Sequence, residues 1–160
     1  MVKTRKFTND LCKKTKLCKG NMGIPRVKMP QFDEKVTKTF LSYLKKNGVK
    51  VKKINIDVRK LKPMQNQLNG DAINNMKKKY KQGMFNINKQ TILVSKNNYI
   101  IDGHHRWGTL RSCLDNVNEC INKNNTFNSK ISTYQINLTP LKIIKLSKSF
   151  KIKYNDINTV

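Results

Sequence analysis

The sequence predicts a single domain of the α+β class. A length of 160 residues fits one domain with a hydrophobic core of its own. Segments with apolar residues at three- and four-residue spacing, typical of helices, lie among shorter segments in which apolar and polar residues alternate, as in strands. The two kinds of segment follow one another irregularly and without an internal repeat, which favours α+β over a regular α/β fold.

The first helix is predicted to begin after Asp33, which is a suitable N-cap residue. Val36, Phe40 and Leu44 lie on one face of this helix, and Gly48 can end it. Residues 50–58 then alternate between apolar and polar side chains, so we expect a strand there.

A second helix is predicted between Asp71, as its N-cap, and Gly83, as its stop signal. Two short apolar segments, residues 92–94 and 99–101, follow on either side of a polar Lys-Asn-Asn sequence, and this pattern predicts a β-hairpin.

A third helix should begin near Gly103, because apolar residues recur at helical spacing from Trp107 to Ile121. An Asn-rich loop is expected over residues 122–130 and a strand over residues 134–138. Pro140 can open the last helix.

The charge of the chain is strongly unbalanced. Thirty-four Lys and Arg residues face nine Asp and Glu residues, a formal net charge of +25. Self-repulsion of this size is most simply explained by a polyanionic partner, and duplex DNA is the most effective one because each neutralised phosphate releases counterions. Twenty-nine of the basic residues are Lys, which favours contacts with the phosphate backbone over reading of base sequence.

Lysines without interleaved acids are the predicted DNA contacts. Residues 1–28 are expected to form a basic N-terminal arm that is extended and partly mobile until bound, and residues 29–160 to form the domain. The predicted contacts lie in this arm, in the central helices and near the C-terminus: Lys13, Lys14, Lys16, Lys19, Lys45, Lys46, Lys50, Lys52, Lys53, Lys77, Lys78, Lys79, Lys81, Lys151 and Lys153.

Residues 102–107, Asp-Gly-His-His-Arg-Trp, lie where a strand is predicted to end and a helix to begin. A helix N-terminus offers unpaired N–H groups to an anion. We therefore consider Gly103, His104, His105 and Arg106 as a candidate phosphate or nucleotide site. Asp102 is either a ligand there or a helix cap, and Arg106 either contacts the anion or pairs with Asp102.

The histidine pair has three possible roles. It can be structural, donate hydrogen bonds to phosphate, or bind a metal. Adjacent histidines point about 100° apart on a helix, whereas a chelating pair needs i, i+4 spacing. We therefore expect neither a metal nor a cofactor. Trp107 opens the apolar stripe and is expected in the core.

Residues 99–107, Tyr-Ile-Ile-Asp-Gly-His-His-Arg-Trp, resemble the signature of the ParB/sulfiredoxin fold in its Asp-Gly-His-His-Arg form. The Leu-Lys-Pro turn at 61–63 and the following helix and hairpin are similar too. This resemblance implies a ParB/sulfiredoxin-like domain, a fold that includes CTP-dependent partition proteins, sulfiredoxins, small-molecule kinases and DNA-nicking domains. The fold alone does not determine the function.

The departures from the family patterns argue against catalysis. Sulfiredoxins place a reactive Cys where His104 stands. The partition proteins have an acid there, followed by a pair of Arg, of which only Arg106 matches. The kinases of this form use a Glu near the Leu-Lys-Pro turn, where this chain has the amides Gln65, Asn66 and Gln67. If the protein is nevertheless an enzyme, the resemblance assigns catalysis to Asp102, His104, His105 and Arg106.

The four cysteines, Cys12, Cys18, Cys113 and Cys120, do not have zinc-finger spacing. We expect them to be reduced, partly buried thiols, and a disulfide between the two pairs is the alternative that the sequence leaves open.

The sequence thus predicts a non-catalytic protein that binds, neutralises and condenses double-stranded genomic DNA, with possible self-association on DNA and no membrane partner. A small-molecule nucleotide is possible but not expected. The alternatives are a nucleotide-dependent enzyme (kinase, CTPase or nicking nuclease) and a basic RNA-binding module. The abundance of Asn, Ile and Lys indicates AT-rich coding. By analogy, a large-DNA-virus protein in the virion core or viral factory is expected, otherwise an intracellular nucleoid protein, and not a secreted one.

Overall fold

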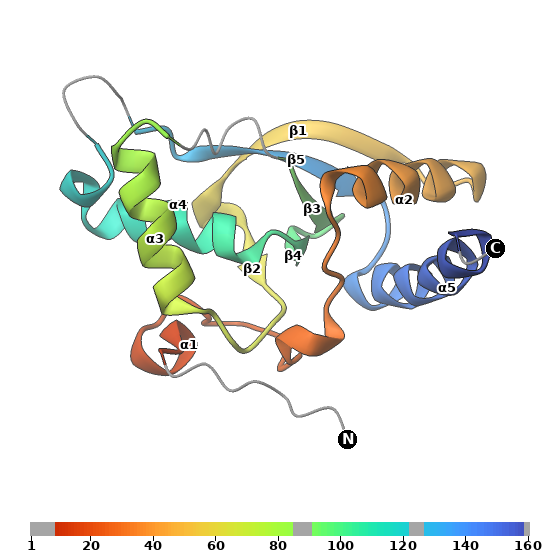
Figure 1. Ribbon diagram of the computed structural model, residues 1–160, viewed down its shortest axis with the longest axis horizontal. Coiled ribbons are helices and arrows are strands. Elements are labelled where there is room, and N and C mark those ends of the chain that lie inside the picture. Colours follow the sequence, from red (N-terminus) through yellow and green to blue (C-terminus); the bar gives the residue numbers. More distant parts are fainter. Residues whose placement is uncertain (1–8, 85–90, 122–126, 159–160) are drawn as a thin grey trace.

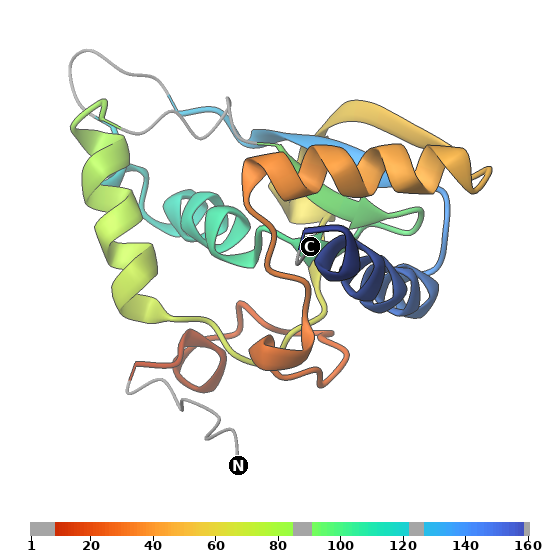
Figure 2. The same ribbon diagram turned by 45° about the vertical axis from the view of Figure 1, so that its right-hand side comes forward.

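A five-stranded sheet separates two groups of helices in the structure, a computed structural model that describes residues 9–84, 91–121 and 127–158 (Figures 1 and 2). Helices α3 and α4 lie on one side, and α2 and α5 pack side by side on the other. The helices are α1 (Leu11–Lys14), α2 (Glu34–Lys46), α3 (Gly70–Lys81), α4 (His104–Asp115) and α5 (Pro140–Asn158). The strands are β1 (Val51–Asp57), β2 (Lys62–Pro63), β3 (Ile92–Ser95), β4 (Tyr99–Asp102) and β5 (Lys130–Ile136).

The sheet is mixed, with the strand order β1-β5-β3-β4-β2. The pairs β1–β5 and β3–β4 are antiparallel, whereas β3–β5 and β2–β4 are parallel. Mixed pairing with irregularly ordered helices confirms the predicted α+β class.

The two faces of the sheet support separate parts of the core. Under α3 and α4, Ile56 and Ile131 pack with Ile73 and Trp107. The indole N–H of Trp107 donates to the Val58 carbonyl (2.9 Å), so this side chain is in the core, as predicted, with its polar atom satisfied.

On the opposite face, α2 and α5 cover Leu93 and Ile136. Phe40 of α2 and Phe150 of α5 have ring centroids 5.2 Å apart and form the centre of an aromatic cluster. Both are almost completely buried. Aromatic pairs at this separation stabilise a helix–helix contact beyond the area that they bury.

Most predicted elements are confirmed, with differences at their ends. Asp33 caps α2 by accepting from the Val36 N–H (2.8 Å). Asn69, not Asp71, caps α3, because its side-chain Oδ1 accepts from the N–H groups of Asp71 and Ala72 in the first helical turn.

Two predicted segments were extended too far. Helix α4 ends at Asp115, because a short 3-10 helix over Val117–Glu119 continues the chain in a new direction. Strand β5 ends at Ile136, so residues 137 and 138 lie outside it, and it begins at Lys130, well before the predicted start at residue 134 and within the predicted loop. Most of the predicted Asn-rich loop, residues 122–126, lies outside the described residues.

The prediction of an extended N-terminal arm is wrong for residues 9–28, which fold against the domain. The Leu11 N–H donates to the Leu68 carbonyl (2.9 Å), and the Leu68 N–H donates to the Asp10 carboxylate (3.0 Å). The Met22 N–H likewise donates to the Met64 carbonyl. Charge and Gly/Pro content led to the wrong expectation, because buried Asp10 and Cys18 supply contacts that composition does not reveal. Residues 1–8 of the arm lie outside the described residues.

The expectation of reduced thiols is also wrong. Cys12 is bonded to Cys18, and Cys113 to Cys120. Each bond lies within a pair, not between the pairs. The first closes a small basic loop that begins within α1, and the second ties the end of α4 to the following 3-10 helix. Disulfides form and persist in oxidising surroundings and are rare in a reducing cytosol.

No helix in the described parts of the chain is long and apolar enough to cross a membrane.

Candidate functional site

Strand β4 leads directly into helix α4 through Gly103. This residue is the N-cap of α4 and has a left-handed backbone (φ 109°, ψ 24°). A Cβ at this position would overlap the side chain of Ile92. The turn therefore requires glycine for its conformation and for the close approach of β3.

The two histidines hold the segment between β2 and α3. Nε2 of His104 accepts hydrogen bonds from the backbone N–H groups of Met64 (3.0 Å) and Gln65 (3.3 Å). Nε2 of His105 accepts from the N–H of Asn69 (3.0 Å). An acceptor Nε2 fixes the tautomer with its proton on Nδ1. The structural role that the sequence left open for this pair is thus observed at both residues.

Burial keeps both imidazoles neutral. Desolvation, reinforced by the neighbouring His105 and by Arg26, lowers the pKa of His104 to about 3. Desolvation and the charge of Arg26 lower the pKa of His105 to about 4. Neither side chain carries a positive charge near neutral pH, so any anion bound here would be neutralised by other groups.

Asp102 connects the turn to a segment seventy residues earlier in the chain. It does not cap α4, since Gly103 occupies that position. Its Oδ2 instead accepts from the N–H of Phe32 (3.4 Å). Burial raises the pKa of this carboxyl, and the charge of Arg106 acts in the opposite direction.

Arg106 is half-buried beside the same turn. Its Nη1 donates to the Thr91 carbonyl (3.4 Å), and burial lowers its pKa while the charge of Asp102 raises it. The charges of Arg106 and Asp102 attract each other, but the two side chains do not form one of the four ion pairs of the described residues. The hydrogen bond that Arg106 makes is the one to the Thr91 carbonyl.

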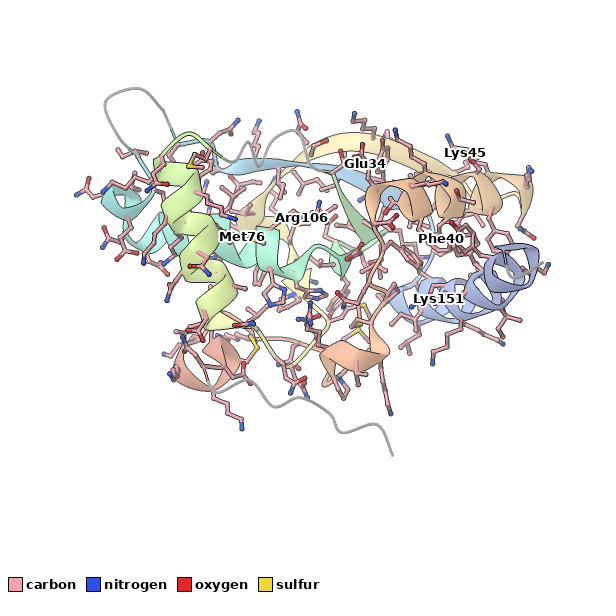
Figure 3. All side chains as sticks on the ribbon, viewed as in Figure 1. Glu34, Phe40, Lys45, Met76, Arg106 and Lys151 are labelled. Atoms are coloured by element: carbon pink, nitrogen blue, oxygen red, sulfur yellow. A yellow bond between two sulfur atoms is a disulfide. The ribbon has the colours of Figure 1, made fainter. Side chains whose placement is uncertain are left out.

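A cavity of about 660 Å³ opens beside this turn, and we call it the turn cavity. The N-termini of α2 and α4 both reach it, through residues 31–34 and 103–106. In Figure 3, Arg106 lies between Met76 of α3 and Glu34 at the start of α2. N-terminal N–H groups and the helix dipoles favour negative charge at such a place.

The turn cavity contains charges of both signs. Three carboxylates line it, from Asp33, Glu34 and Asp102, together with three cationic side chains, from Lys38, Lys53 and Arg106. Gln65 also lines the cavity. It belongs to the amide-rich segment near which the kinases of the resembling family have a catalytic Glu. Asp33 and Glu34 were not predicted as site residues, because nothing local indicates that the start of α2 folds onto the turn.

The predicted DNA-binding lysines are distributed over several regions. Lys13, Lys14, Lys16 and Lys19 are exposed around the loop closed by the first disulfide. Lys78, Lys79 and Lys81 are exposed at the end of α3, whereas Lys77 is half-buried and pairs with Glu119 (3.1 Å).

The remaining predicted lysines lie around α2, β1 and α5. Nζ of Lys53 faces the Tyr134 ring (5.8 Å) inside the turn cavity. Nζ of Lys151 and Lys153 lie 5.7 Å and 5.6 Å from the rings of Phe32 and Tyr43. Lys45, Lys46, Lys50 and Lys52 are exposed near the end of α2 and the start of β1.

Three of these lysines line a second hollow of about 760 Å³, which we call the lysine hollow. Lys45, Lys50 and Lys52 are joined there by Lys96 from the β3–β4 turn, which was not among the predicted contacts. Lys96 stands in a polar turn with no neighbouring cation in the sequence, so nothing local indicated that it belongs to a basic surface. No carboxylate is among the described residues that line this hollow.

No family model, curated protein or solved structure matches this chain.

Proposed function

We propose that this protein binds double-stranded DNA without sequence preference and neutralises and condenses it, on a scaffold like that of the ParB/sulfiredoxin fold. The observation that carries the proposal is uncompensated charge. Among the described residues, four ion pairs engage Lys38, Arg59, Lys77 and Arg111. With a formal net charge of +25, most exposed lysines are left to be neutralised from outside.

The placement of these lysines supports condensation as well as binding. The basic loop that begins within α1, the end of α3 and the exposed side of α5 lie on different sides of the molecule (Figures 1 and 2). A protein with cationic groups on several sides can contact two DNA segments at once. Neighbouring segments then approach because their phosphates are neutralised.

A virion core is a setting that agrees with the two disulfides. A DNA-packaging protein in a particle that leaves the cytosol is exposed to oxidising surroundings, in which disulfides persist. This location is part of the proposal.

The test is gel retardation with several unrelated duplexes of equal length, read beside electron micrographs of long DNA. The proposal predicts equal affinities for all duplexes and compacted particles in the micrographs. One strongly preferred duplex, or binding without compaction, would contradict it. An RNA duplex of the same length, used as competitor, tests the RNA-binding alternative, which predicts that RNA displaces DNA.

A second candidate function is favoured by the turn cavity. Two helix N-termini, three carboxylates and Arg106 line a space of about 660 Å³, which is within the size range of small-molecule sites. The carboxylates of Asp33 and Glu34 supply acids that the sequence did not indicate for base catalysis in this region. Among the described residues, no group of three or more His, Cys, Asp and Glu side chains is placed to hold a metal ion. A nucleotide-dependent enzyme on the same scaffold is therefore the alternative.

Incubation with ATP, ADP or CTP and Mg²⁺, or with supercoiled plasmid, separates the two candidates. The DNA-condensing proposal predicts neither nucleotide turnover nor nicking. Turnover that Arg106→Ala abolishes would establish the enzyme, provided that the variant keeps the thermal unfolding midpoint of the unmodified protein.

A further inference from the structure

The lysine hollow lies where β1 begins, β5 ends and the β3–β4 turn reverses the chain. The backbone around it is held by hydrogen bonds between these segments. The Asn137 N–H donates to the Lys50 carbonyl (3.0 Å), and the Lys96 N–H donates to the Leu138 carbonyl (3.2 Å). Lys52 stands directly opposite Gln135 in the β1–β5 ladder. The four lysines therefore extend from a fixed frame and not from a loose loop.

These lysines come from three places in the sequence and meet without an acid. Lys45 is in the last turn of α2, at the far end of that helix from Glu34 (Figure 3). Lys45, Lys50, Lys52 and Lys96 are all exposed, and none of them takes part in an ion pair with a described residue. Protein surfaces usually mix charges of both signs. Four cations around one hollow repel each other unless an anion lies between them.

The other lining groups suit a phosphate chain. Asn137 adds an amide side chain that can donate to oxygen, and so does Gln135, although its Nε2 already donates one hydrogen bond to Oδ1 of Asn98 (3.1 Å). Gly48, Val49 and Val51, which have no side chain or a small one, also line the hollow. The hollow is open and holds about 760 Å³, so it can accept a stretch of backbone and is not restricted to a single small ion.

We infer that the lysine hollow is the principal binding site for the DNA sugar–phosphate backbone, with its four lysines contacting successive phosphates. This inference rests on the proposed function and deepens it, because it ranks one hollow above the other basic regions. Lys, a mobile point charge, is suited to such contacts and reads no base sequence.

The test compares two variants that lose the same charge. The first carries Lys45→Gln, Lys50→Gln, Lys52→Gln and Lys96→Gln. The control carries Lys28→Gln, Lys35→Gln, Lys60→Gln and Lys130→Gln, four lysines that are also exposed, are outside the described ion pairs and belong to none of the proposed DNA contacts. Binding to one mixed-sequence duplex is measured over a salt series, and circular dichroism checks that both variants are folded.

Loss of the hollow should reduce the slope of log K against log salt by about 3–4, and affinity at 0.1 M salt by about 10³-fold. The control should lose less than about tenfold. Equal losses of affinity in both variants would overturn the inference and leave the proposed function standing, because the exposed lysines would then contribute to DNA binding wherever they lie. Absence of DNA binding by the unmodified protein would overturn the proposed function and the inference with it.

Discussion

The turn cavity and the lysine hollow are similar in volume, about 660 and 760 Å³, and differ in how their charge is balanced. In the turn cavity, three carboxylates face three cations, and the two histidines are held neutral as hydrogen-bond acceptors. In the lysine hollow, four cations meet no described acid. The chain has nine acids and places three of them around one cavity. The fold thus places acids beside the cations of the turn cavity and none beside the cations of the lysine hollow.

The comparison also separates structural from interacting residues. In the turn cavity, Gly103 and His104 are already committed to the fold, since they fix the β4–α4 turn and the segment before α3. In the lysine hollow, the lysine side chains are exposed, and only the backbone takes part in the hydrogen bonds that hold the fold. Substitutions should therefore affect stability in the first region and binding in the second.

The largest effect on stability is expected for Gly103→Ala. The substitution places an L side chain in a left-handed conformation and against Ile92, with a combined cost of about 3–4 kcal/mol in the free energy of unfolding. Gly20→Ala is the matched control, because Gly20 also has a positive φ (81°) but no atom within 4 Å of the added Cβ. Urea unfolding should give a cost of about 1–2 kcal/mol for the control, and equal costs would show that the Ile92 contact is unimportant.

The next effect is expected for His104→Ala. Two buried backbone N–H groups, of Met64 and Gln65, lose their acceptor, at a cost of about 2–4 kcal/mol in the free energy of unfolding. His104→Gln restores a side-chain acceptor and should recover part of that stability in urea unfolding. A His104→Ala protein as stable as the unmodified one would contradict the structural role of this residue.

The same histidine makes stability depend on pH. Its pKa is about 3 in the folded protein, against 6.5 for an unperturbed histidine such as that of the unfolded chain. Between these values the unfolded state binds more protons, so this contribution to stability is complete above about pH 6.5 and decreases as the pH falls. Between about pH 6.5 and 4.5 the loss is roughly 2 kcal/mol. His104→Gln should flatten this part of the stability profile, and an unchanged profile would contradict the assignment.

A similar or smaller effect is expected from the disulfide that closes the basic loop. Replacing Cys12 and Cys18 by Ser should lower the free energy of unfolding by about 2 kcal/mol, given the short loop that the bond closes. The affinity for DNA should change little, because the lysine hollow is elsewhere. Thermal unfolding and gel retardation of the same variant check both statements. A large loss of affinity would show that this loop, and not the lysine hollow, is the principal DNA-binding site.

The smallest effect on stability is expected for Glu34→Gln. The Glu34–Lys38 pair is exposed (3.8 Å between Nζ and Oε1), and such i, i+4 pairs contribute about 0.5 kcal/mol or less. A thermal unfolding curve should therefore be almost unchanged. Glu34→Gln is then a clean probe of the turn cavity, since any loss of a nucleotide-dependent activity would be chemical and not structural.

Local patterns were sufficient to predict most helices and strands. The Asp33 cap and the apolar face of α2 follow from the sequence, and so does the hairpin before Gly103, because each depends on residues close together in the chain. The predictions that were wrong concern contacts between residues that are far apart in the sequence. Asp10 bonding to Leu68 and Phe32 bonding to Asp102 join positions that no periodicity connects.

The candidate sites were predictable to a similar extent. The turn at residues 102–106 was found because its residues are contiguous, but the roles of its histidines depend on backbone N–H groups thirty-six to forty residues away. The lysine hollow was found only in part. Lys45, Lys50 and Lys52 stand out as an acid-free group, whereas Lys96 reaches them only through the pairing of β3 with β5.

The central claim is that a cationic surface left without internal partners holds a phosphate backbone. Its most direct test is the slope of log K against log salt for the unmodified protein and a duplex of arbitrary sequence. With about 6–10 phosphates neutralised, we expect a slope between about −5 and −9. A slope close to zero, or no binding at about 50 mM salt, would contradict the claim.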